Sequence, residues 1–295
     1  MTSIVIPAHN EGRVIGRLLD ALLAGAAAGG TGTGGDVDIV VVCNGCTDDT
    51  ARVAAARGPL VRVVEIPTPS KHAALRVGDE HARGFPRVYV DADVVVGAAD
   101  VRALAGALSR SPDLLAAAPD REIPLTGCAW PVRAYYGVWQ RLPAVREGLF
   151  GRGVIAVSEA GHARIAALPP LMADDLAASQ AFGPGERRVV DTARVVVHPP
   201  RTWSDLVRRR IRAATSSAQF ERFQESGRGG AAAAPSARTG TADLRALLRD
   251  RPRLLPGVVV FAAAALAARR GARKAIRNGD FSTWLRDESS RTGSS

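Results

Sequence analysis

The sequence predicts an α/β protein built on a doubly wound, mostly parallel sheet. Short apolar runs that end in Pro, Gly, Asn or Asp alternate with segments whose apolar residues recur at helical spacing. Four such runs precede residue 94, at about residues 3–6, 37–42, 60–66 and 87–90. This alternation is typical of a parallel sheet, because a helix must carry the chain back before the next parallel strand begins.

The elements follow in order. The first strand stops at Pro7, and the apolar spacing over residues 14–23 predicts an amphipathic helix. The second strand leads into the polar turn at residues 44–50 and a helix through Ala56. The third strand precedes a Pro-rich turn with Lys71 and a helix over His72–Ala82. The fourth strand ends in Asp91-Ala92-Asp93.

The two aspartates after the fourth strand are the most informative feature of the chain. Residues i and i+2 at a strand end project to the same side, and ligands of open α/β sheets bind at the carboxyl ends of the strands. Two close carboxylates require a compensating positive charge, and Mg²⁺ typically takes one or two carboxylates together with phosphate oxygens. A D-x-D sequence also ends ordinary strands in solvent, so its context decides between the two interpretations.

That context resembles glycosyltransferase family two. The similarity covers about residues 2–215 and rests on S-I-V-I-P-A-H-N-E at the start, N-G-C-T-D-D-T after the second strand, Lys71 and V-D-A-D. It implies the A-type glycosyltransferase fold and transfer of a sugar from a nucleotide diphosphate, with inversion at the anomeric carbon. Family members usually carry two acidic residues where this chain has Cys43 and Asn44. The donor base is therefore left open.

The resemblance also implies site residues. Mg²⁺ or Mn²⁺ is expected at Asp91 and Asp93, with His198 as a candidate third ligand and a surface histidine as the alternative. Donor contacts are expected from ten residues: Pro7, Ala8, Asn10, Glu11, Asn44, Lys71, Asp91, Ala92, Arg209 and Arg212. Arg209 and Arg212 share one helical face, where guanidinium groups suit diphosphate oxygens.

The acceptor half is expected between residues 119 and 215. Gly151 and Gly153 would let the backbone approach an acceptor sugar closely, although turn glycines are common. Asp174 and Asp175 match the acidic pair that opens a helix in the family, with Asp175 as the general base. Two acids also cap a helix favourably, which is the structural alternative. Ala213 replaces the tryptophan of processive members, so transfer of a single sugar is expected.

Charge is concentrated at the end of the chain. Residues 1–200 carry 20 basic and 21 acidic side chains, whereas residues 201–295 carry 19 and 8. This excess predicts an anionic partner, either a membrane surface or, less favoured because aromatic residues are few, nucleic acid. An Arg-rich composition alone also produces such a count.

The sequence predicts a catalytic domain over residues 1–215, with a nucleotide-sugar half at 1–118 and an acceptor half at 119–215. A Gly/Ala/Ser-rich linker is expected at 226–241, followed by a basic helical extension at 242–295. The extension contains an 11-residue apolar run over residues 258–268, which is shorter than the roughly 18 to 20 residues needed to cross a bilayer. It is expected either to lie on a membrane surface or to dock on the catalytic domain.

Other classes remain open from the sequence. A nucleotidyltransferase of similar topology uses the same metal chemistry, but its glycine-rich phosphate loop is absent after the first strand. A non-catalytic membrane- or RNA-binding protein would use the sheet as a scaffold. Cys43 and Cys46 have C-x-x-C spacing, but the chain supplies no second half of a zinc site. Three cysteines and no apparent leader predict a cytoplasmic enzyme, with possible peripheral contact at the inner face of the cell membrane.

Overall fold

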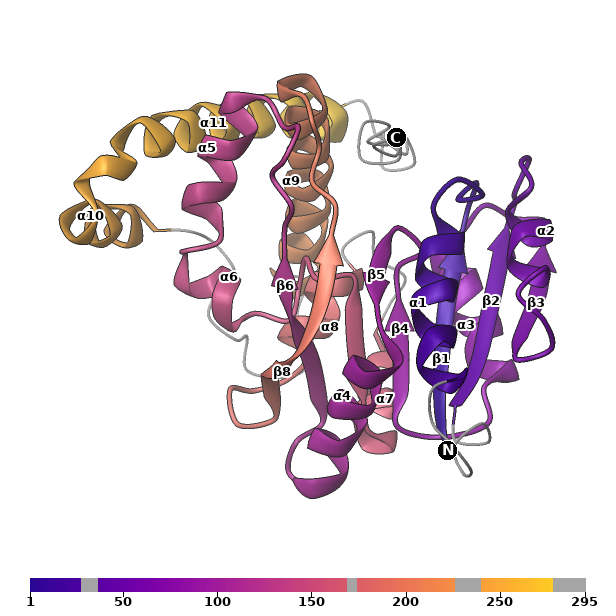
Figure 1. Ribbon diagram of the computed structural model, residues 1–295. Helices are drawn as coiled ribbons and strands as arrows, with labels where there is room; N and C mark the ends of the chain where they lie inside the picture. Colours follow the sequence, from indigo (N-terminus) through magenta and orange to yellow (C-terminus); the bar gives the residue numbers. More distant parts are fainter. Residues whose placement is uncertain (28–36, 169–173, 226–239, 278–295) are drawn as a thin grey trace. The chain divides into compact units, whose positions relative to one another are not determined.

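The structure is a computed structural model that describes residues 1–27, 37–168, 174–225 and 240–277 (Figure 1). The chain forms two compact units, each assembled from three stretches of sequence. Unit 1 comprises Met1–Ile123, Gly151–Pro170 and Ala181–His198. Unit 2 comprises the rest of the chain, and its described elements are all helical.

Unit 1 is built on an eight-stranded sheet with strand order β3-β2-β1-β4-β7-β6-β8-β5. Its strands are β1 (Thr2–Ala8), β2 (Val37–Asn44), β3 (Val61–Ile66), β4 (Arg87–Val90), β5 (Val94–Val96), β6 (Ala116–Glu122), β7 (Val154–Val157) and β8 (Arg187–Val197). Its helices are α1 (Ile15–Ala27), α2 (Thr50–Ala55), α3 (Lys71–His81), α4 (Ala98–Arg110) and α7 (Glu159–Ala166).

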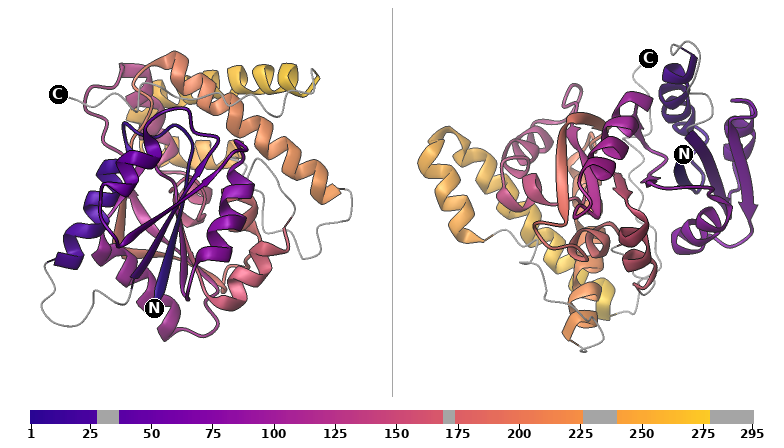
Figure 2. Two further views of the ribbon diagram at one scale, coloured as in Figure 1. Left: turned by 90° about the vertical axis from the view of Figure 1, so that its right-hand side faces the viewer. Right: turned by 90° about the horizontal axis from the view of Figure 1, so that it is seen from below.

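The pairing confirms a doubly wound, mostly parallel sheet. Strand β1 pairs in parallel with β2 and β4, β2 with β3, and β6 with β8. Antiparallel pairs join β7 to β4 and β6, and β5 to β8. The chain leaves β1 through α1 and reaches β4 through α3, and these two helices cover opposite faces of the sheet (Figure 2). The strand order therefore reverses between β1 and β4, the position at which open α/β sheets bind ligands.

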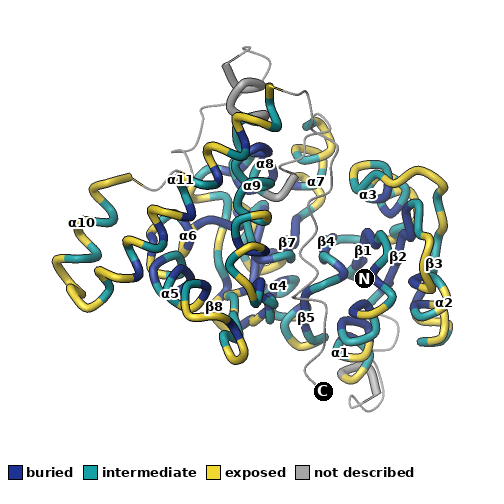
Figure 3. Tube along the Cα trace, turned by 90° about the horizontal axis from the view of Figure 1, so that it is seen from above, coloured by how far each residue is buried: buried dark blue, intermediate teal, exposed yellow. Residues whose placement is uncertain are grey.

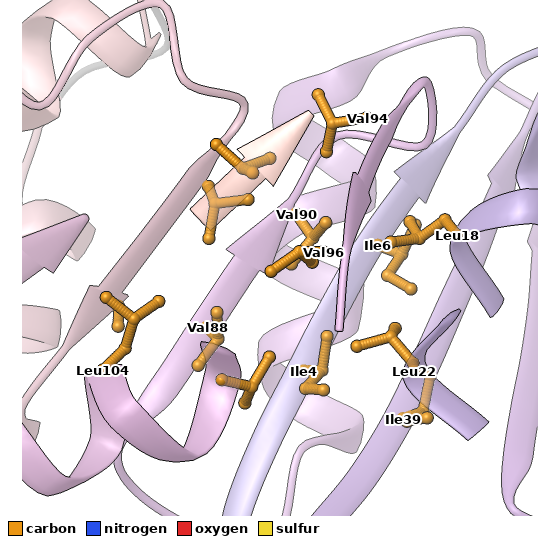
Figure 4. Close-up of a cluster of buried hydrophobic side chains, with 14 of the residues drawn as sticks. Ile4, Ile6, Leu18, Leu22, Ile39, Val88, Val90, Val94, Val96 and Leu104 are labelled. Atoms are coloured by element: carbon orange, nitrogen blue, oxygen red, sulfur yellow. The ribbon is translucent and has the colours of Figure 1, made fainter. Parts of the chain in front are cut away.

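One face of the sheet forms the main core (Figure 4). Alternate residues of the strands, such as Ile4, Ile6 and Val88, belong to the same buried cluster as Leu18 of α1. Each large apolar side chain that is fully buried contributes roughly 1.5–3 kcal/mol. Because the side-chain period of a strand is two, this burial also fixes the register of the strands and places their polar ends at one edge.

The opposite face holds α3 at unusually short range. A Cβ atom on Gly78 would lie 2.3 Å from Cγ1 of Val5, so glycine is what allows this close contact between helix and strand. Ser70 caps the helix, its side chain accepting a hydrogen bond from the amide of Ala73 at 3.2 Å. The close packing and the cap together fix the start of α3, where Lys71 is the first helical residue.

Unit 2 contains seven described helical segments. They are α5 (Trp130–Trp139), α6 (Pro143–Glu147), α8 (Asp174–Gln180), α9 (Trp203–Glu225), α10 (Thr241–Asp250), the 3-10 turn η1 (Pro252–Leu254) and α11 (Leu255–Arg277). Helix α11 packs on α5 and α9. The ring of Phe261 in α11 stacks on Tyr135 of α5 with 5.2 Å between the ring centroids. Residues 226–239 of the predicted linker and residues 278–295 of the predicted extension lie outside the described residues.

The helical C-terminal segment is present, but its apolar part is longer than the sequence predicted. The segment Pro252–Arg277 has 26 residues and a mean hydropathy of 1.5 in its best window, so by length and composition it is long enough to cross a membrane. The expectation that this segment is too short to span is therefore wrong on length and composition. The count of 11 residues began after Gly257 and ended before Arg269, whereas the helix continues through both positions.

Candidate active site

The carboxyl ends of β1 and β2 are joined by buried polar contacts. Asn44 is only 3% exposed, and its amide nitrogen donates to the carbonyl oxygen of Ala8 at 2.8 Å. The Nδ1 atom of His9 lies 2.6 Å from the carbonyl oxygen of Asn44. These two contacts join the end of β1 to the end of β2, and they hold the two strand ends at a fixed distance from each other. The contact of Asn44 with a donor base stays a prediction.

The turns beyond these strands are also linked. Asn10 adopts a left-handed conformation with φ of 52°, which asparagine tolerates better than most residues. Its Oδ1 atom accepts hydrogen bonds from the amides of Thr47 at 2.6 Å and Asp48 at 3.3 Å. In return, the amide of Gly12 donates to Asp48 at 3.1 Å, and the amide of Glu11 donates to the Thr50 hydroxyl at 2.8 Å. The two turns therefore form one preorganised polar rim.

The cysteines beside this rim have a structural environment. Cys43 is 1% exposed, and burial, reinforced by the neighbouring Cys46 thiol, raises the pKa of Cys43 to about 12. Its thiol therefore stays protonated at neutral pH and is a poor metal ligand or nucleophile. Cys43 and Cys46 form no disulfide, and Cys46 accepts a hydrogen bond from the amide of Asn10 at 3.4 Å. The pair thus contributes packing and a hydrogen bond at the rim.

Asp91 follows β4 on the other side of the reversal point. Its amide donates to the carbonyl oxygen of Gly153 at 2.8 Å, which holds the strand end against the 151–153 turn. Its carboxylate accepts from Nζ of Lys71 at 2.8 Å, and 39% of the Asp91 side chain is exposed. Asp91 therefore has a fixed backbone, an accessible carboxylate and a cation in contact with it.

The glycines of the 151–153 turn are required by its shape. Gly151 and Gly153 have φ of 65° and 67°, a region that residues with a Cβ atom rarely adopt. A Cβ atom on Gly153 would lie 2.5 Å from Cγ1 of Val94 and 3.3 Å from Oδ2 of Asp91. The turn is held to the end of β6 by two arginines. Arg121 donates to the carbonyl oxygen of Gly151 at 3.3 Å, and the fully buried Arg152 donates to that of Pro119 at 2.8 Å.

Asp93 lies in the short turn between β4 and β5, two residues beyond Asp91. Strand β5 pairs antiparallel with β8, with Val94 opposite Val197. Continuing this register by one residue places His198 opposite Asp93. Among the described residues, however, no three His, Cys, Asp or Glu side chains are grouped closely enough to hold a metal ion. The backbone thus brings His198 beside the aspartates without assembling a three-ligand site.

Asp91 and Asp93 suit a divalent cation most of whose ligands are water and substrate oxygens. Two half-exposed carboxylates at a strand end fit an ion that takes one or two protein carboxylates and completes its shell with phosphate oxygens and water. A site fully enclosed by protein ligands would need more donors than Asp91 and Asp93 supply.

The remaining predicted residues belong to unit 2. Asp174 and Asp175 are the first two residues of α8. Arg209 and Arg212 lie near the start of α9, and both are half-buried. Between them, Arg210 approaches the ring of Tyr135 at 6.0 Å from its centroid, which fixes how α9 faces α5.

Comparison with known proteins decides the family. Residues 3–163 match the sequence pattern described as Glycosyl transferase family 2, and these residues are more than half of the chain. The chain belongs to glycosyltransferase family 2. It is therefore a glycosyltransferase, an enzyme that transfers a glycosyl group from a nucleotide sugar.

Relatives and solved structures agree with this assignment. An uncharacterized glycosyltransferase of Mycobacterium tuberculosis is 32% identical over 171 residues, which cover 52% of this chain and 71% of that protein. The 4,4'-diaponeurosporenoate glycosyltransferase of Staphylococcus aureus is 37% identical over 97 residues, covering 31% of this chain and 24% of the relative. The structure also resembles a mannosyltransferase from Pyrobaculum calidifontis in complex with GDP-Man and Mn²⁺. The TM-score is 0.58 at 20% identity, with 98% of this chain and 84% of the other covered. This likeness confirms the A-type glycosyltransferase fold.

Several residues of this family 2 enzyme were not found from the sequence. Neither His9 nor Asp48 was predicted as a site residue, although both bond across the strand ends. Arg121 and Arg152 were also missed, because the carbonyl oxygens to which they donate, those of Gly151 and Pro119, lie 30 and 33 residues away in the sequence. For Asp48 the signal was available, since Asp and Thr after a strand are typical of hydrogen-bonded turns.

Proposed function

We propose that this glycosyltransferase is metal-dependent and inverting, and that it moves one sugar from a nucleotide diphosphate sugar to a hydroxyl acceptor. The observation that carries the proposal is the Asp91 carboxylate at the reversal point of the sheet, accessible and already paired with a cation, Lys71, at 2.8 Å. Family membership favours this reaction over nucleotidyl transfer.

Asp91 and Asp93 would hold Mg²⁺ or Mn²⁺. That ion would neutralise charge on the donor diphosphate and so stabilise the departing nucleotide. When the donor binds, Lys71 would leave Asp91 and contact a phosphate oxygen instead. The Asp91 carboxylate would thus be neutralised by Lys71 before donor binding and by the metal ion afterwards. The backbone register opposite Asp93 supports His198 as an accessory ligand.

The polar rim would receive the nucleoside. Its rigidity favours recognition, because groups that are already fixed lose little freedom on binding. The proposed contacts are Pro7, Ala8, Asn10, Glu11, Asn44 and Ala92. The amide nitrogen of Asn44 donates to Ala8, and its Oδ1 atom is the group that we propose meets the donor base, whether uracil, guanine or thymine.

Unit 2 would supply the remaining groups. Asp175 would accept the proton of the acceptor hydroxyl as that oxygen attacks the anomeric carbon, with Asp174 beside it. Arg209 and Arg212 would bind the diphosphate and stabilise the charge left on it. Gly151 and Gly153 of unit 1 would let the acceptor approach the backbone. We place the reaction in the cytoplasm, at the inner face of the cell membrane, where a glycan, a small molecule or a lipid-linked hydroxyl would serve as acceptor.

The test is donor turnover by the purified chain. UDP-, GDP- and dTDP-sugars are incubated after chelation and again after addition of Mn²⁺ or Mg²⁺, and nucleotide release is followed. We expect turnover of one donor class that stops on chelation and returns with metal. NMR of the transferred sugar should show the inverted anomer. Metal-independent turnover or a retained anomer would contradict the proposal.

A further inference from the structure

Helices α10 and α11 expose an unusual surface of unit 2 (Figure 3). Helix α10 has no buried residue, and its leucines Leu244, Leu247 and Leu248 are only half-buried. They share one face by their spacing, whereas Arg245 and Arg249 are exposed. Within the described part of the chain, α10 therefore has an apolar face that is only partly covered.

Helix α11 has one face packed and one face open. Its buried residues recur at intervals of three or four, and they include Gly257, Phe261 and Ala264. A Cβ atom on Gly257 would lie 3.0 Å from the carbonyl oxygen of Ala134, so α5 approaches closely here. A Cβ atom on Gly271 would likewise lie 2.5 Å from Ile211 of α9. The packed face is therefore complementary to α5 and α9 along much of the helix.

The open face carries apolar residues in line with arginines. Leu255, Val259 and Leu266 are 56%, 62% and 49% exposed, and they are three of the six exposed large apolar residues in the described part of the chain. Arg273 follows Leu255 by 18 residues, which is five whole turns of an α-helix, so both point the same way. The open face is thus apolar over its first turns and basic over its last.

The surrounding charge has a single sign. Residues 240–277 contain nine basic and two acidic side chains, and all nine basic residues are exposed. None of the nine forms an ion pair with another described residue. Unpaired surface cations beside exposed leucines and valines match a partner that is anionic at its surface and apolar beneath it.

We propose that this surface, formed by α10 and the open face of α11, docks on an anionic lipid bilayer, with α11 lying in the plane of the interface. Leu255, Val259 and Leu266 would enter the acyl boundary, while Arg269, Arg273 and their neighbours contact lipid phosphates. A flat orientation follows from the packed face, because a spanning helix would have to leave α5 and α9. Single-stranded nucleic acid is a poorer match, since binding there relies on exposed aromatic stacking platforms. The single aromatic residue of α10 and the described α11, Phe261, is buried.

The test measures binding of the full chain to vesicles of phosphatidylglycerol with phosphatidylcholine, and to phosphatidylcholine alone. We expect binding to the anionic vesicles alone. The binding should weaken from about 0.01 M to about 1 M salt, over which the Debye length falls from about 30 Å to about 3 Å. Vesicle binding is measured without sugar transfer, so a negative result here would not count against the proposed reaction, and a failure of the proposed reaction would not count against vesicle binding.

Matched variants assign the binding to the surface. Arg269→Glu with Arg273→Glu should weaken it by about 25-fold or more, at about fivefold for each basic residue lost. Val259→Asp with Leu266→Asp should also weaken it, and since both residues are exposed the fold should survive. The controls make the same changes on unit 1, at Arg102 and Arg110 and at the exposed Leu60, and should bind like wild type. Equal binding by the α11 variants and these controls would overturn the proposal.

Two further results would also overturn it. Intact protein that ignores anionic vesicles at low salt, or that binds single-stranded RNA with the same dependence on α11 arginines and leaves vesicles untouched, excludes lipid as the partner. Protein expressed in cells should be released from membranes by alkaline carbonate, because it lies on the surface. Retention after carbonate would show a spanning helix instead.

Discussion

The carboxyl end of β4 in unit 1 and helices α10 and α11 of unit 2 differ in how their charged side chains are paired. In unit 1 Lys71 pairs with Asp91 at the carboxyl end of β4, and two further ion pairs, Arg87 with Asp79 and Arg62 with Asp38, lie at the amino ends of the strands. In unit 2 the arginines of α10 and α11 are exposed and form no ion pair with described residues. A site that stabilises developing charge needs groups fixed in advance, whereas attachment to a lipid surface needs only net charge and apolar area. We infer that unit 1 holds the metal and donor site, whereas the exposed arginines of α10 and α11 hold the enzyme at a membrane surface.

The largest expected effect comes from removing the carboxylates of unit 1. Asp91→Asn and Asp93→Asn nearly preserve side-chain shape but remove the charge that would hold the metal ion. We expect each to abolish most sugar transfer while the melting temperature changes little. Asp113→Asn is the control, because Asp113 is an exposed carboxylate of the same unit. Transfer at the wild-type rate by both variants would place the metal site elsewhere.

The next effect tests whether unit 2 takes part in the chemistry. Asp175→Asn should lower kcat by about 10²–10⁴, the usual contribution of a positioned acid or base, and leave donor affinity unchanged. Asp174→Asn should have a smaller effect. If the order is reversed, Asp174 is the base. If neither changes kcat, the pair only caps α8 and the chemistry belongs to unit 1 alone.

Gly153→Ala tests the rigidity of the turn that holds Asp91. The left-handed conformation alone costs about 1–2 kcal/mol for a residue with a Cβ atom. The added atom would also press on Val94 and approach the Asp91 carboxylate, so both stability and transfer should fall. Gly58→Ala is the matched control, since Gly58 has φ of 90° but open space around it. Gly58→Ala should lower stability and leave the rate of sugar transfer unchanged. Equal transfer rates for the two variants would show that the 151–153 turn does not influence the site.

Lys71→Gln tests the cation beside Asp91. We expect a raised KM for the donor, about tenfold or more, because a charge-assisted contact worth roughly 1.5–3 kcal/mol is lost. Arg76→Gln changes an exposed cation of the same helix and should behave like wild type. An unchanged KM for Lys71→Gln would show that Lys71 does not contact the donor and only neutralises Asp91.

The smallest effect concerns His162, which lies in helix α7 and contacts Tyr89 of β4. Burial is the main cause that lowers the pKa of His162, and Tyr89 lies 2.9 Å from its Nδ1 atom. A lowered folded-state pKa means that the unfolded chain binds more protons, so the free energy of unfolding should fall as pH drops below about 6.5. His162→Gln should flatten this slope between pH 7 and pH 5 in denaturant titrations, and His72→Gln should not. Parallel slopes for all three proteins would remove His162 as the cause.

The sequence predicted the parts of the fold that depend on local signals. Strands β1 to β4 are short apolar runs closed by Pro, Asn or Asp, and each lies within a few residues of its expected position. The pairing of β5 to β8 depends on contacts distant in sequence, so periodicity alone did not reveal it. The same holds for unit 2, which collects three separate stretches of chain. Helix α5 was missed because its Pro-containing start lacks apolar periodicity, although its tyrosines and valines are buried.

The candidate site divides in the same way. Asp91 and Lys71 were identified from motif and resemblance, and the structure adds the ion pair between them. Burial was not visible in the sequence, so the bond from Asn44 to Ala8 was not predicted, while the contact of Asn44 with a donor base stays a prediction. Exposure was equally hidden on α11, where one face of an apolar helix is packed and the other is open.

Thermal stability with donor and metal tests the central claim most directly. Wild type and an Asp91→Asn, Asp93→Asn double variant are heated with UDP-, GDP- or dTDP-sugars, with and without Mn²⁺. A ligand at 100 times its Kd stabilises the folded state by about 2.7 kcal/mol. We predict such a shift for wild type with one donor class, larger with Mn²⁺, and loss of the metal-dependent part in the double variant. No shift with any nucleotide, or a metal-dependent shift that the double variant retains in full, would contradict a donor site built on these two aspartates.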